Sequence, residues 1–231
     1  MQIDTSFDVR FDAGGKDPDT HSPTLRQYHR KLWSKPLPSG RPFDLSDKVP
    51  GVYLHHRSDL GEFFLSSDSI VNSLTRWKSM GHICALFSEE ENEAFRTINS
   101  TVGATIIFPG NWIGGKNTIN GARGFIRKIA DRMDLTLESI RRHYLGEPSP
   151  LGETLSRYDD FFQLFEDFEG YVDFFLLQDL VDEDSGVKFF MPFDDFEGPS
   201  VPQDLDTYRT YRHRSIEFVA ARNSRIEGQS L

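Results

Sequence analysis

Hydrophobic and polar residues alternate with two different periods along the chain, one typical of strands and one typical of helices. Residues 7–11 alternate Phe and Val with charged side chains, which predicts a half-buried strand. Two apolar runs, 52–54 and 63–65, flank an Asp-Leu-Gly turn and predict a hairpin. A continuous apolar run over 104–108 predicts a buried strand. The first half of the chain therefore supplies most of the expected strands.

Apolar residues at helical spacing, preceded by capping residues, predict helices over much of the remaining chain. Ser22 and Pro23 are typical of a helix start, and this helix runs to Trp33. Ser88, with Glu91 three residues later, forms a capping box that opens another helix. Further expected elements are helices over 70–77 (capped by Ser67 or Asp68), 119–133, 134–144 (capped by Asp134), 150–165, 171–180 and 205–226, and a strand over 187–191.

The order of these elements predicts a single α+β domain over residues 1–231. We expect a small mixed or antiparallel sheet packed by several helices, with a helix-rich C-terminal half. No apolar run approaches the roughly 20 residues that span a bilayer, and the polar start MQIDTSFDVR does not resemble a secretory signal. Cys84 is the only cysteine, which excludes an intrachain disulfide. These features predict a cytoplasmic protein without membrane contact.

Charge is distributed in blocks along the chain, and the net charge is −10. Thirteen acidic residues and one basic residue, Lys188, lie within 159–197, whereas 123–143 and 209–225 are basic. The overall acidity argues against nucleic acid as a partner. The acidic and basic segments either pair with one another, or leave a basic face open to an anionic ligand.

The glycine-rich turn after the 104–108 strand is the most suggestive motif. Gly110, Gly115 and Lys116 match the G-x-x-x-x-G-K spacing of a phosphate-binding loop. In that loop a Ser or Thr follows the lysine and binds magnesium, but here the hydroxyl comes one residue late, at Thr118. A strand-to-helix turn, with the helix starting near Thr118, explains the same residues. Anion binding at this turn is the functional alternative.

Four residues form the candidate ligand site: Lys116, Thr118, Arg123 and Arg132. Lys116 and Arg123 are seven residues apart, which is about two helical turns. They are expected to bind a phosphate-bearing small molecule at the start of the basic helix. Because Arg123 and Arg132 belong to a dense charged stretch, buried ion pairs between helices are the competing interpretation.

The acidic segment 159–197 is also rich in phenylalanine and supports a second hypothesis. An exposed aromatic surface there would make the protein a non-enzymatic interaction module that binds another protein. The same phenylalanines are core residues if they are buried.

Other candidate motifs are incomplete. Asp17-x-Asp19-x-His21 lacks the glycine and the glutamate of a calcium-binding loop, so a flexible acidic turn is favoured. The seven histidines show no metal-binding spacing, and Ser66 and Ser67 lie outside a G-x-S-x-G motif. No metal site is predicted, and no cofactor or enzyme class is indicated.

Several longer strings resemble a known family. These are LWSKPLPSGRPFDL, GEFFLSSDSI, TINGARG, ADRMDLTLESIRRHY and GYVDFFLLQDLV. They resemble a bacterial family of uncharacterised proteins, mainly actinobacterial, that is defined as a domain of unknown function. The resemblance covers about 7–226 and implies a bacterial origin and one family-wide domain. It implies no activity, cofactor or catalytic residue.

Overall fold

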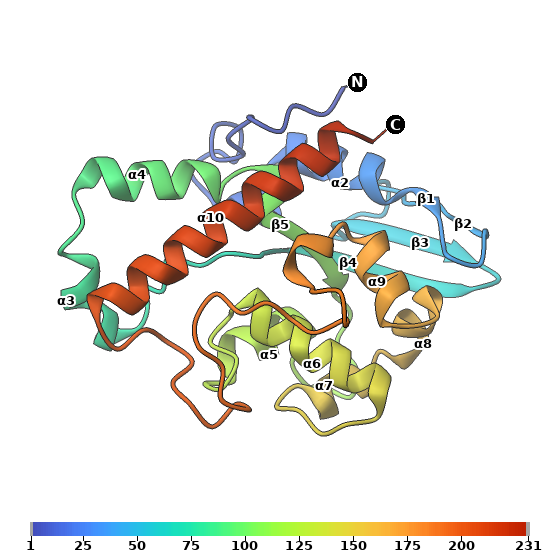
Figure 1. Ribbon diagram of the computed structural model, residues 1–231. Coiled ribbons are helices and arrows are strands. Elements are labelled where there is room, and N and C mark those ends of the chain that lie inside the picture. Colours follow the sequence, from blue (N-terminus) through green and yellow to red (C-terminus); the bar gives the residue numbers. More distant parts are fainter. Residues whose placement is uncertain (1, 230–231) are drawn as a thin grey trace.

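A three-stranded antiparallel sheet lies at the centre of the computed structural model, which describes residues 2–229 (Figure 1). Its strands are β3 (Leu54–Ser58), β4 (Gly61–Ser69) and β5 (Thr105–Pro109), in the order β3-β4-β5. The first half of β4 pairs with β3, and residues 65–69 pair with β5. The predicted hairpin and the predicted buried strand are therefore confirmed. A second sheet consists of β1 (Lys35–Pro36) and β2 (Pro42–Phe43).

Helices surround this sheet and fill the C-terminal half of the chain, as an α+β fold requires. The α-helices are α1 (Pro18–His21), α2 (Pro23–Trp33), α3 (Gly81–Cys84), α4 (Glu89–Ile98), α5 (Ile119–Phe125), α6 (Met133–Leu145), α7 (Gly152–Ser156), α8 (Asp159–Phe162), α9 (Phe168–Phe174) and α10 (Leu205–Glu227). Short 3-10 helices are η1 (Lys78–Met80), η2 (Val102–Ala104), η3 (Gln163–Phe165) and η4 (Gln178–Leu180). The α+β class, with antiparallel sheets, is confirmed.

Local capping chemistry fixes the helix starts that the sequence predicted best. Ser22 Oγ accepts a hydrogen bond from the Leu25 amide at 3.1 Å, and α2 begins at the next residue. The capping box of Ser88 and Glu91 is complete at the start of α4. Thr118 caps α5, so the predicted turn from strand to helix is confirmed. These signals involve neighbours within three residues, which a sequence displays directly.

Tertiary contacts override the pattern in two places where helices were predicted. The helix predicted over 70–77 does not form, and Ser67 and Asp68 do not cap a helix, because β4 continues through them and pairs with β5. The helix predicted over 119–133 ends at Phe125, and residues 130 and 131 adopt positive φ angles. Asp134 does not cap α6, since its carboxylate bonds Arg132 instead.

Further corrections concern segments that are less regular than predicted. Residues 7–11 form turns rather than a strand, because the Asp8 carboxylate accepts the Arg10 amide and so competes with strand pairing. The 187–191 strand is reduced to one bridge between Val181 and Val187. The helices predicted over 150–165 and 171–180 are broken into short pieces: α7, α8, η3, the end of α9 and η4.

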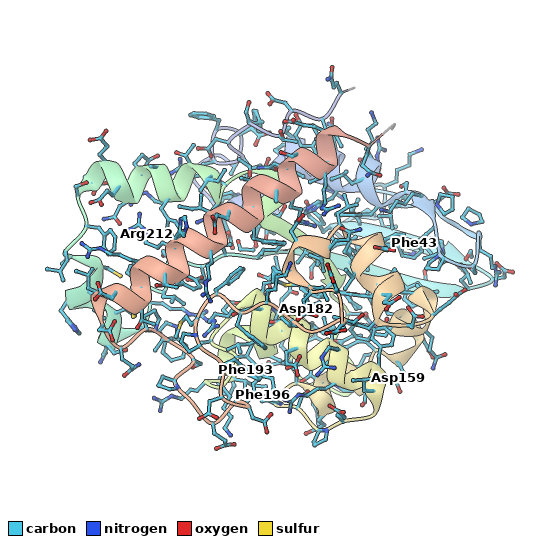
Figure 2. The ribbon with its side chains drawn as sticks, in the orientation of Figure 1. Phe43, Asp159, Asp182, Phe193, Phe196 and Arg212 are labelled. Atoms are coloured by element: carbon cyan, nitrogen blue, oxygen red, sulfur yellow. The ribbon has the colours of Figure 1, made fainter. Side chains whose placement is uncertain are left out.

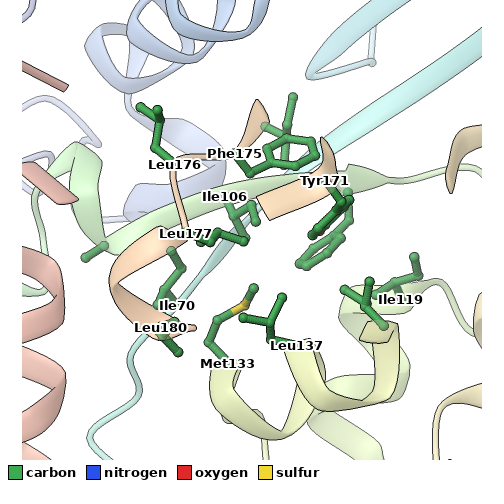
Figure 3. Close-up of a cluster of buried hydrophobic side chains, with 14 of the residues drawn as sticks. Ile70, Ile106, Ile119, Met133, Leu137, Tyr171, Phe175, Leu176, Leu177 and Leu180 are labelled. Atoms are coloured by element: carbon green, nitrogen blue, oxygen red, sulfur yellow. The ribbon is translucent and has the colours of Figure 1, made fainter. Parts of the chain in front are cut away.

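The phenylalanine-rich segment builds the core. Phe161, Phe165 and Phe175 are at most 1% exposed, and their rings pack edge-to-face or tilted at 5.2–6.5 Å. Figure 3 shows Leu177 and Leu180, which follow Phe175 along the chain, gathered with Ile106 of β5 and with Met133 and Leu137 of α6. These phenylalanines are therefore unavailable for the exposed aromatic surface that an interaction module requires.

The acidic segment pairs with both basic segments, as predicted. Arg225 Nη2 of α10 donates to Asp179 Oδ1 at 2.9 Å, and Lys128 Nζ lies 2.8 Å from Glu197 Oε1. Arg142 of α6 forms an ion pair with Asp195. Part of the acidic charge is thus neutralised within the fold. These pairs are at least partly exposed, so each contributes little stability on its own.

A buried histidine links α2 to the sheet. His29 is fully buried; its Nδ1 lies 3.0 Å from the Tyr53 hydroxyl and its Nε2 lies 3.0 Å from Thr105 Oγ1. Thr105 Oγ1 donates to the Val102 carbonyl, so it must accept the Nε2 proton, and Nδ1 accepts the Tyr53 hydroxyl. Burial, assisted by the charge of Arg222, lowers the pKa of His29 to about 3.

This histidine predicts sensitivity to acid. The unfolded chain binds a proton at His29 below pH 6.5 and the folded chain does not, so the free energy of unfolding falls as the pH decreases from 6.5 toward 3. The slope from this group approaches about 1.4 kcal/mol per pH unit. Urea denaturation at several pH values should show a flatter dependence for His29→Gln than for wild type. Parallel pH profiles would contradict this assignment.

Candidate functional site

The four residues of the sequence-predicted ligand site do not form one accessible cluster. Lys116 is exposed and forms an ion pair with Glu153, while Thr118 is occupied as the cap of α5. Arg123 and Arg132 are at most 1% exposed. Because α5 is only seven residues long, its start provides a weak dipole for an anion.

Buried hydrogen bonds account for both arginines. Arg123 pairs with Asp68 and donates from Nη2 to the Ser69 carbonyl at 3.1 Å, on the edge of β4 that β3 leaves uncovered. Arg132 donates from Nε to Asp134 at 3.1 Å and from Nη1 to the Ser200 carbonyl at 3.0 Å. Buried ion pairs therefore describe both residues, although neither pair joins two helices as expected: Arg123 pairs with β4, and Arg132 pairs with a residue two positions away.

A cavity of about 560 Å³ beside α10 is a better candidate site. Its lining residues are Asp179, Leu180, Lys188, Phe189, Phe190, Arg214, Glu217, Phe218 and Ala221. This volume lies within the range of known small-molecule sites, which are mostly apolar with a few placed polar groups. The cavity therefore has the size and the mixed lining of a ligand site.

One wall of the cavity is a stripe along α10. Arg214, Glu217, Phe218 and Ala221 follow the i, i+3, i+4, i+7 spacing, so they lie on one side of the helix. The adjacent side of α10 is buried against the core, and Figure 1 shows this helix crossing the molecule above the 180–204 segment. Because the packed helix holds its backbone in place, the Arg214 side chain projects from a rigid position.

The opposite wall is held by the chain reversal at 182–186. The Val181–Val187 bridge and the hydrogen bond from the Lys188 amide to the Leu180 carbonyl, 2.8 Å, place Lys188 beside η4. The Phe190 amide donates to the buried Asp134 carboxylate at 2.8 Å. Lys188 is thus positioned by backbone bonds, although its side chain is exposed.

Aromatic rings form the apolar part of the site. Phe190 packs against Phe218 with ring centroids 6.1 Å apart, and Phe189 stacks on Phe193 at 4.0 Å. Figure 2 shows Phe193 in the loop below α10. The Phe189 carbonyl accepts a hydrogen bond from Arg214 Nη1 at 2.8 Å, which ties the two walls together.

The charged residues that line the cavity differ in whether they have a partner of opposite charge. Asp179 is bonded to Arg225, and Glu217 lies 3.3 Å from His213 Nε2. The hydrogen bond to Asp179 raises the pKa of Arg225. In contrast, neither Lys188 nor Arg214 has a carboxylate within ion-pair distance among residues 2–229. Two cations beside an apolar floor suit an organic anion that has a hydrophobic body.

Sequence reasoning found parts of this site but not the site itself. Lys188 is the single basic residue of the acidic segment, and 209–225 is a basic stretch that leaves a face open in one of the two alternatives. No local pattern places Lys188 next to Arg214, because the two lie 26 residues apart and meet only through η4 and α10. In the described part of the chain, no group of three His, Cys, Asp or Glu side chains is arranged to hold a metal ion.

Comparison with known proteins places the chain in a family but supplies no activity. No helix among residues 2–229 combines the length and apolarity needed to cross a membrane. No curated protein and no solved structure matches the chain. A family model matches residues 3–226, nearly the whole described chain, and the chain belongs to the family of unknown function DUF6994.

Proposed function

We propose that this protein binds a small organic anion in the cavity between α10 and the 188–190 segment. The observation that carries the proposal is the pair of cations, Lys188 and Arg214, that face a phenylalanine-lined cavity without a carboxylate partner. The expected ligand class, an anionic small molecule, is that of the sequence hypothesis, but the site moves from the glycine turn to α10. We also propose that the chain forms a single domain, that it comes from a bacterium and that it is cytoplasmic.

The ligand class follows from the lining. An anionic group such as a carboxylate, sulfonate or phosphate would contact Lys188 and the Arg214 nitrogens that are not bonded to Phe189. The apolar body would lie against Phe189, Phe190 and Phe218, where its transfer from water contributes about 25 cal/mol per Å² of buried apolar surface. Both features together favour amphipathic anions over inorganic phosphate.

Naphthalene-2-sulfonate and neutral 2-naphthol form a matched pair of probes for this site. Isothermal titration calorimetry at low salt should show that the sulfonate binds about tenfold more tightly than the naphthol, because charge-assisted hydrogen bonds contribute 1.5–3 kcal/mol. Lys188→Ala and Arg214→Ala should each weaken sulfonate binding about 5- to 20-fold, and 2-naphthol should be little affected. Added salt should weaken the binding of the sulfonate and leave the binding of 2-naphthol unchanged, because salt screens the charge interaction.

Two control variants separate this site from other basic residues. Lys48→Ala removes an exposed lysine away from the cavity, and Lys116→Ala tests the glycine turn. Both should leave sulfonate affinity unchanged. Equal affinities for sulfonate and naphthol, or a loss of binding in Lys116→Ala but not in Lys188→Ala, would refute the proposed site.

A further inference from the structure

The cavity beside α10 contains a carboxylate that an anionic ligand alone does not explain. Glu217 lines this cavity together with Arg214 and Lys188. The other carboxylate of the lining, Asp179, accepts hydrogen bonds from Arg225 at both of its oxygens. The cavity therefore presents two cations and one carboxylate that no lysine or arginine within residues 2–229 neutralises.

The negative charge of Glu217 is available to a ligand. Its one ion-pair neighbour in the described chain is His213, whose Nε2 lies 3.3 Å from Glu217 Oε1. His213 does not line the cavity, and an imidazole attracts a carboxylate only when it is protonated. Both side chains are mostly exposed, so this contact is weak and leaves Glu217 able to accept a second donor.

Arg214 and Glu217 lie one turn apart on the cavity side of α10 but do not pair with each other. Side chains at i and i+3 leave a helix about 5–6 Å apart. Arg214 reaches the opposite wall, where its Nη1 donates to the Phe189 carbonyl at 2.8 Å. Among the described residues, no ion pair joins Arg214 to Glu217. Opposite charges that are neighbours without contact leave room for one ligand that carries both charges.

The apolar surface of the cavity begins directly beside these charges. Phe218 follows Glu217 in the sequence and packs against Phe190, with the ring centroids 6.1 Å apart. Phe189, whose carbonyl holds Arg214, also lines the cavity. An α-amino acid carries its ammonium group, its carboxylate and its side chain on one carbon atom. These three groups match the carboxylate, the cations and the rings of the lining.

We infer that the ligand of this cavity is a zwitterion of the aromatic amino-acid type, an inference that rests on the proposed function. The carboxylate of the ligand contacts Lys188 and Arg214, its ammonium group donates to Glu217, and its ring lies against the phenylalanines of the lining. A simple anion would leave Glu217 without a partner and would be repelled by it. Because the ammonium group replaces this repulsion with attraction, Glu217 selects the zwitterion over simple anions.

Three probes separate the two charges: L-phenylalanine, 3-phenylpropanoate, which lacks the ammonium group, and 2-phenylethylamine, which lacks the carboxylate. Isothermal titration calorimetry on the full chain uses low salt and pH 8, where imidazoles are largely neutral. L-phenylalanine should bind about tenfold more tightly than either analogue, because each analogue lacks one charge-assisted hydrogen-bonding group. Glu217→Gln should remove its advantage over 3-phenylpropanoate without weakening 3-phenylpropanoate itself. Arg214→Ala should remove its advantage over 2-phenylethylamine.

Glu147→Gln is the matched control, because it removes an exposed carboxylate that lies outside the cavity. It should change none of the three affinities, and His213→Ala should leave the advantage of L-phenylalanine intact. Arg214 and Glu217 are exposed, so their variants should keep a wild-type-like melting transition. The comparison of the three probes on the wild-type chain needs no variant.

The outcomes separate this inference from the proposed function. If naphthalene-2-sulfonate binds in a Lys188-dependent manner but L-phenylalanine binds no better than 3-phenylpropanoate, the cavity takes simple anions and the zwitterion is wrong. An advantage of L-phenylalanine that survives Glu217→Gln would also overturn the inference. If neither the sulfonate nor L-phenylalanine binds, the proposed function itself is refuted.

Discussion

Arg123→Met is expected to lower the free energy of unfolding by about 3–5 kcal/mol, because it removes one partner of a buried ion pair. The variant leaves the Asp68 carboxylate and the Ser69 carbonyl without their donors at the edge of β4. Thermal denaturation should show a fall in Tm of roughly 6–20 °C for a chain of this size. Most of this loss of stability comes from leaving two buried acceptors without hydrogen bonds, and less of it comes from losing the attraction between the two charges.

A double-variant cycle tests this explanation. Asp68→Asn combined with Arg123→Met should recover part of the lost stability, because the unpaired charge is gone. Lys116→Ala, which breaks the exposed ion pair with Glu153, should change stability by less than about 1 kcal/mol. If Arg123→Met were as mild as Lys116→Ala, Arg123 would not be part of the buried framework, and the glycine-turn hypothesis would regain support.

Trp33→Ala is expected to destabilise the fold by a similar amount, about 3–5 kcal/mol, because it opens a cavity in the core. Trp33 is fully buried, with its ring 5.2 Å from that of Phe175 and 6.1 Å from that of Phe174. Its ring thus packs the end of α2 against the end of α9. Urea denaturation of the variant should report this loss as a lower transition midpoint.

Trp33→Phe provides the matched control. Trp33 Nε1 is buried and has no hydrogen-bond acceptor among residues 2–229, so the smaller ring also removes an unsatisfied donor. We expect a loss of only about 1 kcal/mol for Trp33→Phe. Equal losses for the two variants would show that packing of the α2 end does not depend on aromatic volume.

The sequence predicts those parts of the fold that depend on near neighbours. Ser22 and Ser88 cap their helices through amides three residues away, and the 54–65 hairpin follows from alternating residues around a short turn. Asp68 shows the limit of such reasoning. Its position resembles a helix cap, but pairing of β4 with β5 and the buried Arg123 decide its conformation. Contacts across 55 residues leave no local pattern.

The candidate sites show the same division. Arg123 and Arg132 have the residue type expected of an anion site, yet burial turns them into structural groups. Lys188 is distinguished in the sequence only as the single base of the acidic segment, and only the 180–188 chain reversal and the orientation of α10 bring it to one cavity with Arg214. Residue type predicts which chemistry is present, whereas exposure and partners decide which residues are free to use it.

Amide chemical-shift mapping with naphthalene-2-sulfonate tests the central claim most directly. It locates the bound anion on the folded chain without relying on a variant. The account predicts that the largest shifts occur at residues 188–190 and 214–221, which line the cavity beside α10. Shifts centred on 110–118, or shifts spread over the surface without saturation, would contradict it.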